Sequence, residues 1–129
     1  MSDHSKFAPS SMGRLMQCAG SLNFASLYPQ EVTSVAADEG TLAHEVAAVT
    51  LLAGTLPEGA TDEMCEFAEN YRSYVQPDKT THVEEWVDCA GVYPGCFGTP
   101  DAYKIKREIK LLMIWDYKFG FRPVEVKNN

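Results

Sequence analysis

The sequence is poor in positive charge, with 11 Lys and Arg against 18 Asp and Glu and a net charge of −7. Proteins bind the phosphate backbone largely through lysine and arginine, so this balance disfavours nonspecific nucleic-acid binding over most of the surface. The basic residues are nevertheless concentrated. Residues 1–100 carry four basic and fourteen acidic side chains, whereas residues 101–129 carry seven and four. Any DNA contact is therefore expected in the basic region of residues 104–127.

Long apolar runs are also missing from the sequence. The longest, residues 46–56 and 111–115, are too short to cross a bilayer. The opening MSDHSK lacks the basic-then-apolar order of a secretory signal peptide. A composition of 45% hydrophobic and 22% charged residues is typical of a globular domain rather than a disordered chain. We therefore expect a cytoplasmic protein with no membrane partner.

Familiar metal and phosphate motifs are absent as well. The four cysteines include no CxxC pair, so neither zinc nor an iron–sulfur cluster is favoured and free thiols are expected. Cys89 and Cys96 bracket AGVYPG and could approach each other across a turn, which does not by itself make a disulfide. No P-loop or GxGxxG spacing occurs. Chemistry at a site must therefore come from other side chains.

Helix caps and stops organise the first half of the chain. Ser10 or Ser11, Thr41 and Thr61 are predicted N-caps because their hydroxyls can accept a backbone N–H of the first turn. With Gly20, Gly54 and Pro77 as stops, helices are predicted over residues 10–20, 41–54 and 61–77. Residues 23–38 show no sustained period and are predicted to be mostly loop.

From Thr81 the pattern changes to β-branched and aromatic residues, which predict strands. These strands span residues 81–89, 95–105 and 109–119, and residues 121–126 form a fourth strand or a loop. The order indicates an α+β fold in which N-terminal helices pack on a mainly antiparallel sheet. We expect one domain over residues 1–129.

Two aspartates and a lysine are the first candidate site. Asp101 follows GTP at a strand start, and the apolar run of residues 111–115 ends in Asp116, with Lys118 two positions later on the same strand face. Hairpin pairing of the two strands would bring both carboxylates together. Such oxygens suit Mg²⁺ or Mn²⁺, and a lysine beside them suits phosphodiester hydrolysis. The alternative, which this short motif alone favours, is an exposed Asp–Lys contact with Asp101 as a turn residue.

The segment GTLAHEVA adds His44 to these candidates. His44 lies inside an otherwise apolar predicted helix, where a buried imidazole needs a partner. A carboxylate-bound metal is one such partner. The alternative for a lone histidine is partial exposure or a hydrogen bond to backbone.

Together these segments resemble a known nuclease branch. The order G-x-x-x-H (residues 40–44), G-T-x-D (98–101) and an apolar strand ending D-Y-K (116–118) resembles the RecB-like branch of the PD-(D/E)XK nuclease superfamily. The opening, residues 7–29, is similar to a phage and prophage family placed in that branch. The resemblance covers about residues 7–129. It implies a restriction-endonuclease-like core and a bacterial host cell.

The resemblance also implies roles for the candidate residues. His44, Asp101 and Asp116 would be ligands of Mg²⁺ or Mn²⁺, and Lys118 would assist the attacking water, so that all four are expected catalytic residues of a metal-dependent DNA nuclease.

The sequence departs from the branch after the D-x-K strand. Relatives continue into a helix with a glutamine and a tyrosine, whereas this sequence stops eleven residues after Lys118. We therefore expect either a truncated nuclease-like domain or a short form whose open sheet face is covered by a second copy or a protein partner. The alternative function is a catalytically inactive nuclease-fold binding protein, such as a phage inhibitor of a host nucleic-acid-processing or defence complex.

Overall fold

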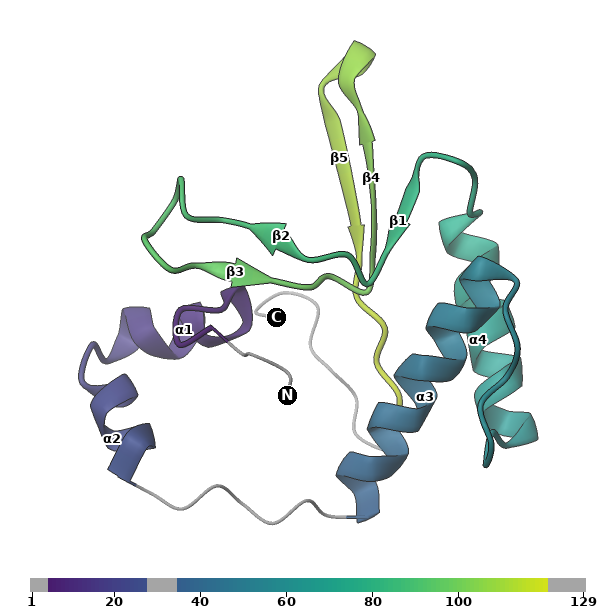
Figure 1. Ribbon diagram of the computed structural model, residues 1–129, viewed down its shortest axis with the longest axis horizontal. Helices are drawn as coiled ribbons and strands as arrows, with labels where there is room; N and C mark the ends of the chain where they lie inside the picture. Colours follow the sequence, from purple (N-terminus) through teal and green to yellow (C-terminus); the bar gives the residue numbers. More distant parts are fainter. Residues whose placement is uncertain (1–4, 28–34, 121–129) are drawn as a thin grey trace. The chain divides into compact units, whose positions relative to one another are not determined.

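The computed structural model describes residues 5–27 and 35–120, which form helices and short antiparallel sheets (Figure 1). The helices are α1 (Pro9–Gln17), α2 (Ser21–Leu27), α3 (Val35–Leu52) and α4 (Asp62–Val75). The strands are β1 (Thr81–Val83), β2 (Val87–Asp88), β3 (Phe97–Gly98), β4 (Ala102–Lys106) and β5 (Leu111–Trp115), with a 3₁₀ turn η1 (Arg107–Ile109) between the last two. This confirms the predicted α+β class. None of the helices in these ranges is long and apolar enough to cross a membrane.

The described residues belong to two compact units. The first unit contains residues 5–27 and 85–99, and the second contains residues 35–84 and 100–120. The expectation of one nuclease-like domain over residues 1–129 stays a prediction.

The first unit consists of α1, α2 and the β2–β3 hairpin. The strands pair antiparallel, with Asp88 opposite Phe97. Helix α1 begins at Pro9 after Ala8, so the predicted capping by Ser10 or Ser11 was wrong. Proline explains the earlier start, because its fixed φ suits the first helical position and its missing N–H needs no acceptor there. Helix α2 lies partly in the stretch predicted as loop, which corrects that prediction for residues 23–27 and, with α3, for 35–38.

The two helices of the second unit differ in how well their starts were predicted. Helix α4 begins as expected, since Thr61 Oγ1 accepts the backbone N–H of Met64 at 3.2 Å. Helix α3 begins at Val35 instead of after Thr41, which was therefore wrongly predicted as a cap. Thr41 Oγ1 donates to the carbonyl of Ala37 at 3.0 Å, one turn back within the same helix. A threonine hydroxyl can serve either role, and local sequence does not separate them.

The second unit contains an antiparallel sheet in the order β1-β4-β5. Ala102 lies opposite both Val83 of β1 and Trp115 of β5, which confirms the predicted hairpin in its core. The strand predicted over residues 81–89 is wrong in its continuity, because β1 ends at Val83 and β2 belongs to another sheet. Glu84, with φ of 48°, turns the chain at that point. The strand or loop predicted over residues 121–126 lies outside the described residues.

Helices α3 and α4 pack together and supply most of the core of the second unit. One cluster joins these helices to a residue beyond β5, and it consists of Ala43, Val46, Ala47, Met64, Ala68 and Tyr117. A second joins the helices to the sheet, and it consists of Leu51, Val75 and Ala102 with Val83, Tyr71 and Trp115 against them. These contacts hold the ends of β1, β4 and β5 near the middle of α3.

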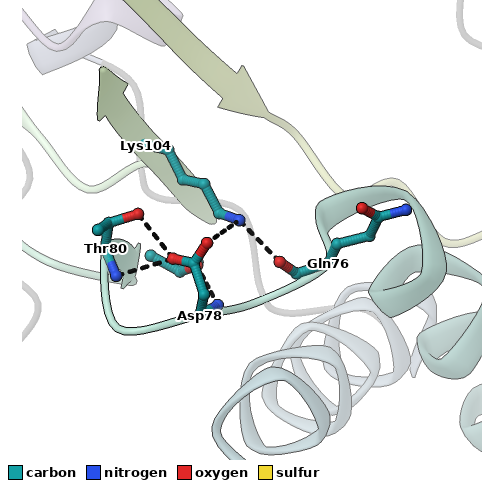
Figure 2. A network of polar contacts seen from close by, with 5 residues as sticks. Gln76, Asp78, Thr80 and Lys104 are labelled. Carbon is teal, nitrogen blue, oxygen red and sulfur yellow. Dashed lines mark hydrogen bonds and ion pairs between the residues drawn. The ribbon is translucent and has the colours of Figure 1, made fainter. Parts of the chain in front are cut away.

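Hydrogen bonds of Lys104 link β4 to the chain that follows α4 (Figure 2). Although it belongs to the basic region, it is only 5% exposed. Its Nζ donates to the carbonyl of Gln76 at 2.7 Å and to Asp78 Oδ2 at 3.2 Å. The hydroxyl and N–H of Thr80, followed by Lys104, hold the pKa of Asp78 well below its usual value. Lys104 is thus engaged inside the fold, and Lys106, Arg107 and Lys110 are the exposed basic residues of the hairpin.

Candidate metal centre

Three side chains of the second unit converge on one point. His44, Glu84 and Asp101 each offer a ligand atom, and these atoms all lie within 4.8 Å of one another. His44 Nδ1 is 3.3 Å from Asp101 Oδ1, and the two side chains are 33% and 20% exposed. The group therefore lies at the surface with one side closed by protein.

The sheet register explains why two carboxylates meet here. Val83 pairs with Ala102, so Glu84 and Asp101 are the next residues beyond the two strand ends. The N–H of Glu84 donates to the carbonyl of Asp101 at 3.1 Å, which holds the two backbones together. The other Asp101 oxygen, Oδ2, accepts the N–H of Tyr117 at 2.6 Å. Asp101 is therefore oriented by backbone from β1 and from the end of β5.

Helix α3 supplies the imidazole. His44 lies near the middle of α3, a helix whose other face is buried through Ala43, Val46 and Ala47. Its ring meets the edge of the Tyr117 ring with centroids 5.4 Å apart. This contact and the Asp101 carboxylate fix the imidazole orientation. The predicted need of His44 for a partner is met by Asp101.

The charges within this group are coupled. The hydrogen bond to Asp101 raises the pKa of His44 above its ordinary value, against the opposing effects of burial and of Lys118. Burial alone would raise the pKa of Asp101, but the hydrogen bonds from His44 and Tyr117 and the charges of His44 and Lys118 bring it below its usual value. Asp101 is therefore an anion at neutral pH, held by two donors.

Glu84 has the opposite shift. Burial and then the negative charge of Asp101 raise the pKa of Glu84, and His44 only partly offsets them. Two carboxylates at this separation repel each other, and a cation between them would remove that repulsion. Carboxylate oxygens with an imidazole nitrogen are a ligand set that suits Mn²⁺, and the carboxylates suit Mg²⁺. The residues present thus fit the divalent metal expected from the sequence.

Asp116 and Lys118 lie beside this group. Lys118 Nζ is 2.8 Å from Asp116, and both side chains are about half exposed. The Lys118 charge acts on both His44 and Asp101, as their pKa values show. Within residues 5–27 and 35–120, Asp116 is not part of the three-residue group. The structure therefore brings His44 and Asp101 into direct contact, adds the Lys118 charge to them, and pairs Asp116 with Lys118.

Glu84 is the ligand candidate that sequence reasoning missed. A strand continuing through residue 89 made Glu84 an ordinary strand residue, with no reason to meet Asp101. The available signal was the paired glutamates of VEEW directly after an alternating strand. Pairing that strand with AYKI would have placed Glu84 opposite Asp101.

A shallow groove and a phenol border the group. The groove runs along α3 and is lined by Ala37, Gly40, Thr41, His44, Glu45 and Glu84. On the other side Tyr71 donates to the carbonyl of Trp115 at 3.5 Å. Burial, followed by the charges of Asp101, Asp116 and Glu84, raises the pKa of Tyr71, so its hydroxyl stays a neutral donor. The Tyr71 hydroxyl is thus engaged with the backbone at the end of β5, and what the site offers is acceptors for a cation.

Comparison with known proteins assigns the chain to a family. Residues 4–129 match the family described as a protein of unknown function, DUF2800. The chain belongs to the DUF2800 family. No curated protein and no solved structure matches it. In this DUF2800 chain the matched range includes all the residues of the candidate centre.

A glutamate pair tests the centre of the DUF2800 chain. Glu84→Gln is expected to weaken Mn²⁺ binding by about 10-fold or more, because it removes an anionic ligand while keeping the side-chain size. Glu85→Gln, at the neighbouring position outside the three-residue group, is the matched control and should bind as the wild type does. Calorimetric titration with Mn²⁺ measures both. Equal affinities of the two variants would contradict the role of Glu84.

Proposed function

We propose that this protein is a Mg²⁺- or Mn²⁺-dependent DNA nuclease of the RecB-like branch of the PD-(D/E)XK superfamily, encoded by a phage or prophage and acting in the cytoplasm of a bacterial host. The observation that carries the proposal is the convergence of His44, Glu84 and Asp101 beside Lys118. His44, Asp101 and Lys118 follow the chain order of the motifs that resemble the branch, whereas Glu84 belongs to none of these motifs.

The metal centre would be held by His44, Glu84 and Asp101, with Asp116 beside it. A bound divalent cation would supply Lewis acidity to a phosphate oxygen and acidity to water. His44 and the N–H of Tyr117 keep the Asp101 carboxylate ionised and oriented. The α3 and Tyr117 contacts limit motion of the imidazole, so the ligand set is preorganised.

Lys118 is suited to act on the phosphate. Its ammonium group is anchored by Asp116 at 2.8 Å and is half exposed, so it can reach a substrate without leaving a buried charge behind. A lysine there neutralises charge that develops on the phosphate and orients the attacking water. Asp116 and Lys118 directly follow the end of β5 at Trp115, and their side chains are paired there.

DNA would meet the protein through the basic region. The exposed positive side chains of the hairpin are Lys106, Arg107 and Lys110, which lie around η1 at one end of β4 and β5. The candidate centre lies at the opposite end of the same strands. A duplex or single strand lying along this hairpin would place one phosphate near the centre while others meet the tip.

Two substitutions test catalysis. Asp116→Ala and Lys118→Ala are each expected to reduce Mn²⁺-dependent cleavage by about 10²-fold or more, because Lys118 would neutralise charge on the phosphate and Asp116 holds the Lys118 ammonium group. A fluorescently end-labelled DNA, offered in single- and double-stranded form, provides the assay. Lys79→Ala, an exposed lysine in the turn before β1, is the control and should cut normally. Unchanged cutting by both site variants, with circular dichroism showing folded protein, would exclude this assignment.

One observation favours a second function, a noncatalytic nuclease-fold binding protein that inhibits a host nucleic-acid-processing or defence complex. The β4–β5 face bearing Ile105, Leu112 and Ile114 is apolar, and these side chains are 44%, 56% and 61% exposed. A second copy or a protein partner would cover such a face. Mn²⁺ binding without any DNA cleavage by the wild type would favour this alternative.

A further inference from the structure

Two cysteines face each other in the β2–β3 hairpin of the first unit. Val87 pairs with Gly98 and Asp88 pairs with Phe97, so Cys89 and Cys96 are the next pair in the same register. The N–H of Cys89 donates to the carbonyl of Cys96 at 2.9 Å. This single hydrogen bond closes the base of the turn, and residues opposite each other in this register direct their side chains to the same face of the hairpin.

This geometry matches what a disulfide needs. Residues directly opposite each other in an antiparallel pair have Cα atoms about 4.5–5.5 Å apart, within the range of about 4.4–6.8 Å that disulfides join. Both thiols are free and they contact each other. Burial, and after it the charge and hydrogen bond of the Cys89 thiol, raises the pKa of Cys96. Closing the bond removes one proton from each thiol and two electrons from the pair.

The turn between the cysteines holds this spacing in the reduced protein. Within it the N–H of Cys96 donates to the carbonyl of Tyr93 and the N–H of Val92 donates to the carbonyl of Cys89, both at 2.9 Å. Outside it, the hydroxyl of Ser5 donates to the carbonyl of Gly95 at 2.5 Å. The Phe7 and Tyr93 rings also pack with centroids 4.7 Å apart. These contacts hold the turn that connects the two cysteines.

We propose that Cys89 and Cys96 form a redox modification site, at which a low-molecular-weight disulfide of the glutathione class converts the facing thiols to a reversible intramolecular disulfide. The site lies wholly in the first unit and shares no residue with the candidate metal centre. A test of this redox site is therefore independent of a test of the proposed nuclease function.

The difference in exposure sets the order of steps. Cys96 is 4% exposed, whereas Cys89 is only partly buried. Cys89 meets the oxidant first: its thiolate attacks one sulfur of the small disulfide, that S–S bond breaks, and one small thiolate leaves and takes up a proton. Cys96 then loses its proton and attacks the Cys89 sulfur, which releases the second small thiol. The protein loses two electrons and two protons, and the oxidant becomes two thiols.

Oxidised glutathione tests the proposal on the full chain. After incubation and alkylation of remaining thiols, peptide mapping by mass spectrometry is expected to show a Cys89–Cys96 bridge in most chains, reversed by excess reduced glutathione. Cys18, which is exposed, and Cys65, which is partly buried in the second unit, are internal controls. They should carry mixed disulfides or remain free. Absence of the bridge, or pairing no more frequent than with Cys18 and Cys65, would overturn the proposal.

Two serine variants test the order of steps. Cys96→Ser removes the resolving thiol, so Cys89 should accumulate a stable mixed disulfide with glutathione. Cys89→Ser removes the accessible thiol, and Cys96 should stay mostly reduced because it is buried. The reverse pattern would contradict the assigned order. If either variant failed to fold, the bridge in the wild-type chain would still decide whether the site exists.

Discussion

Asp101→Asn is expected to abolish Mn²⁺-dependent cleavage and to weaken Mn²⁺ binding by about 10²-fold. Loss of a residue that only orients a metal ligand already lowers metal affinity, and Asp101 is a proposed ligand itself. Asparagine keeps an oxygen that can accept the N–H of Tyr117, so the fold should survive. The variant loses the charge that attracts both the cation and the His44 imidazole. Asp88→Asn, an exposed carboxylate of the first unit, is the control. Full binding and cleavage by Asp101→Asn would remove the metal centre from consideration.

The same substitution has a signature that needs no metal. Asp101 raises the pKa of His44, so in Asp101→Asn that pKa should fall, as measured by NMR titration of the imidazole. The linkage to stability has a definite sign. The raised pKa of His44 stabilises the fold below pH about 6.5 and this contribution is lost as pH rises. The lowered pKa of Asp101 stabilises it above pH about 4 and this contribution is lost on acidification. Relative to the wild type, Asp101→Asn should therefore lose most free energy of unfolding between pH about 4 and pH about 6.5.

Lys104→Ala is expected to lower the free energy of unfolding by about 2 kcal/mol, because it removes charge-assisted hydrogen bonds to Gln76 and Asp78. It also removes the buried aliphatic stem of the lysine. Lys104→Met retains most of that stem and should lose less. Urea unfolding measures both variants. Lys106→Ala, two positions along the same strand and exposed, is the control and should change stability by about 0.5 kcal/mol or less.

DNA binding distinguishes this internal role of Lys104 from a contact with phosphate. A lysine that contacts phosphate changes the slope of affinity against salt by about one when it is removed. We expect no such change for Lys104→Met and a reduced slope for Arg107→Ala. An unchanged unfolding free energy together with a reduced salt slope in Lys104→Met would contradict the structural role.

What the sequence predicted depended on how local the controlling interaction was. The Thr61 cap and the β4–β5 hairpin were predicted because each is set by residues near in sequence. The true start of α3 was not, because the Thr41 hydroxyl can serve as a cap or bond back to the preceding turn. The α+β class was predicted from the order of the helical and strand patterns along the chain. Errors at helix ends do not change that order.

The candidate site shows the same difference between interactions that are local in sequence and interactions that are not. His44 and Asp101 were predicted together through motif order, and their contact at 3.3 Å could not be derived from spacing along the chain. Glu84 required the register between β1 and β4, which pairs residues far apart in sequence. Burial of Lys104 required knowing that the end of α4 lies beside β4. Local sequence patterns indicate which secondary structure is favoured, whereas tertiary packing decides which charged groups are buried.

The turn at Glu84 has an architectural consequence. Residues 85–99 leave the sheet after one candidate ligand and return just before the other, and the hydrogen bond from Glu84 to Asp101 closes the base of this excursion. The length and sequence of residues 85–99 can therefore change without changing the spacing of the Glu84 and Asp101 carboxylates. A different module could be grafted at this junction, by evolution or by design, while the pair of acids keeps its alignment.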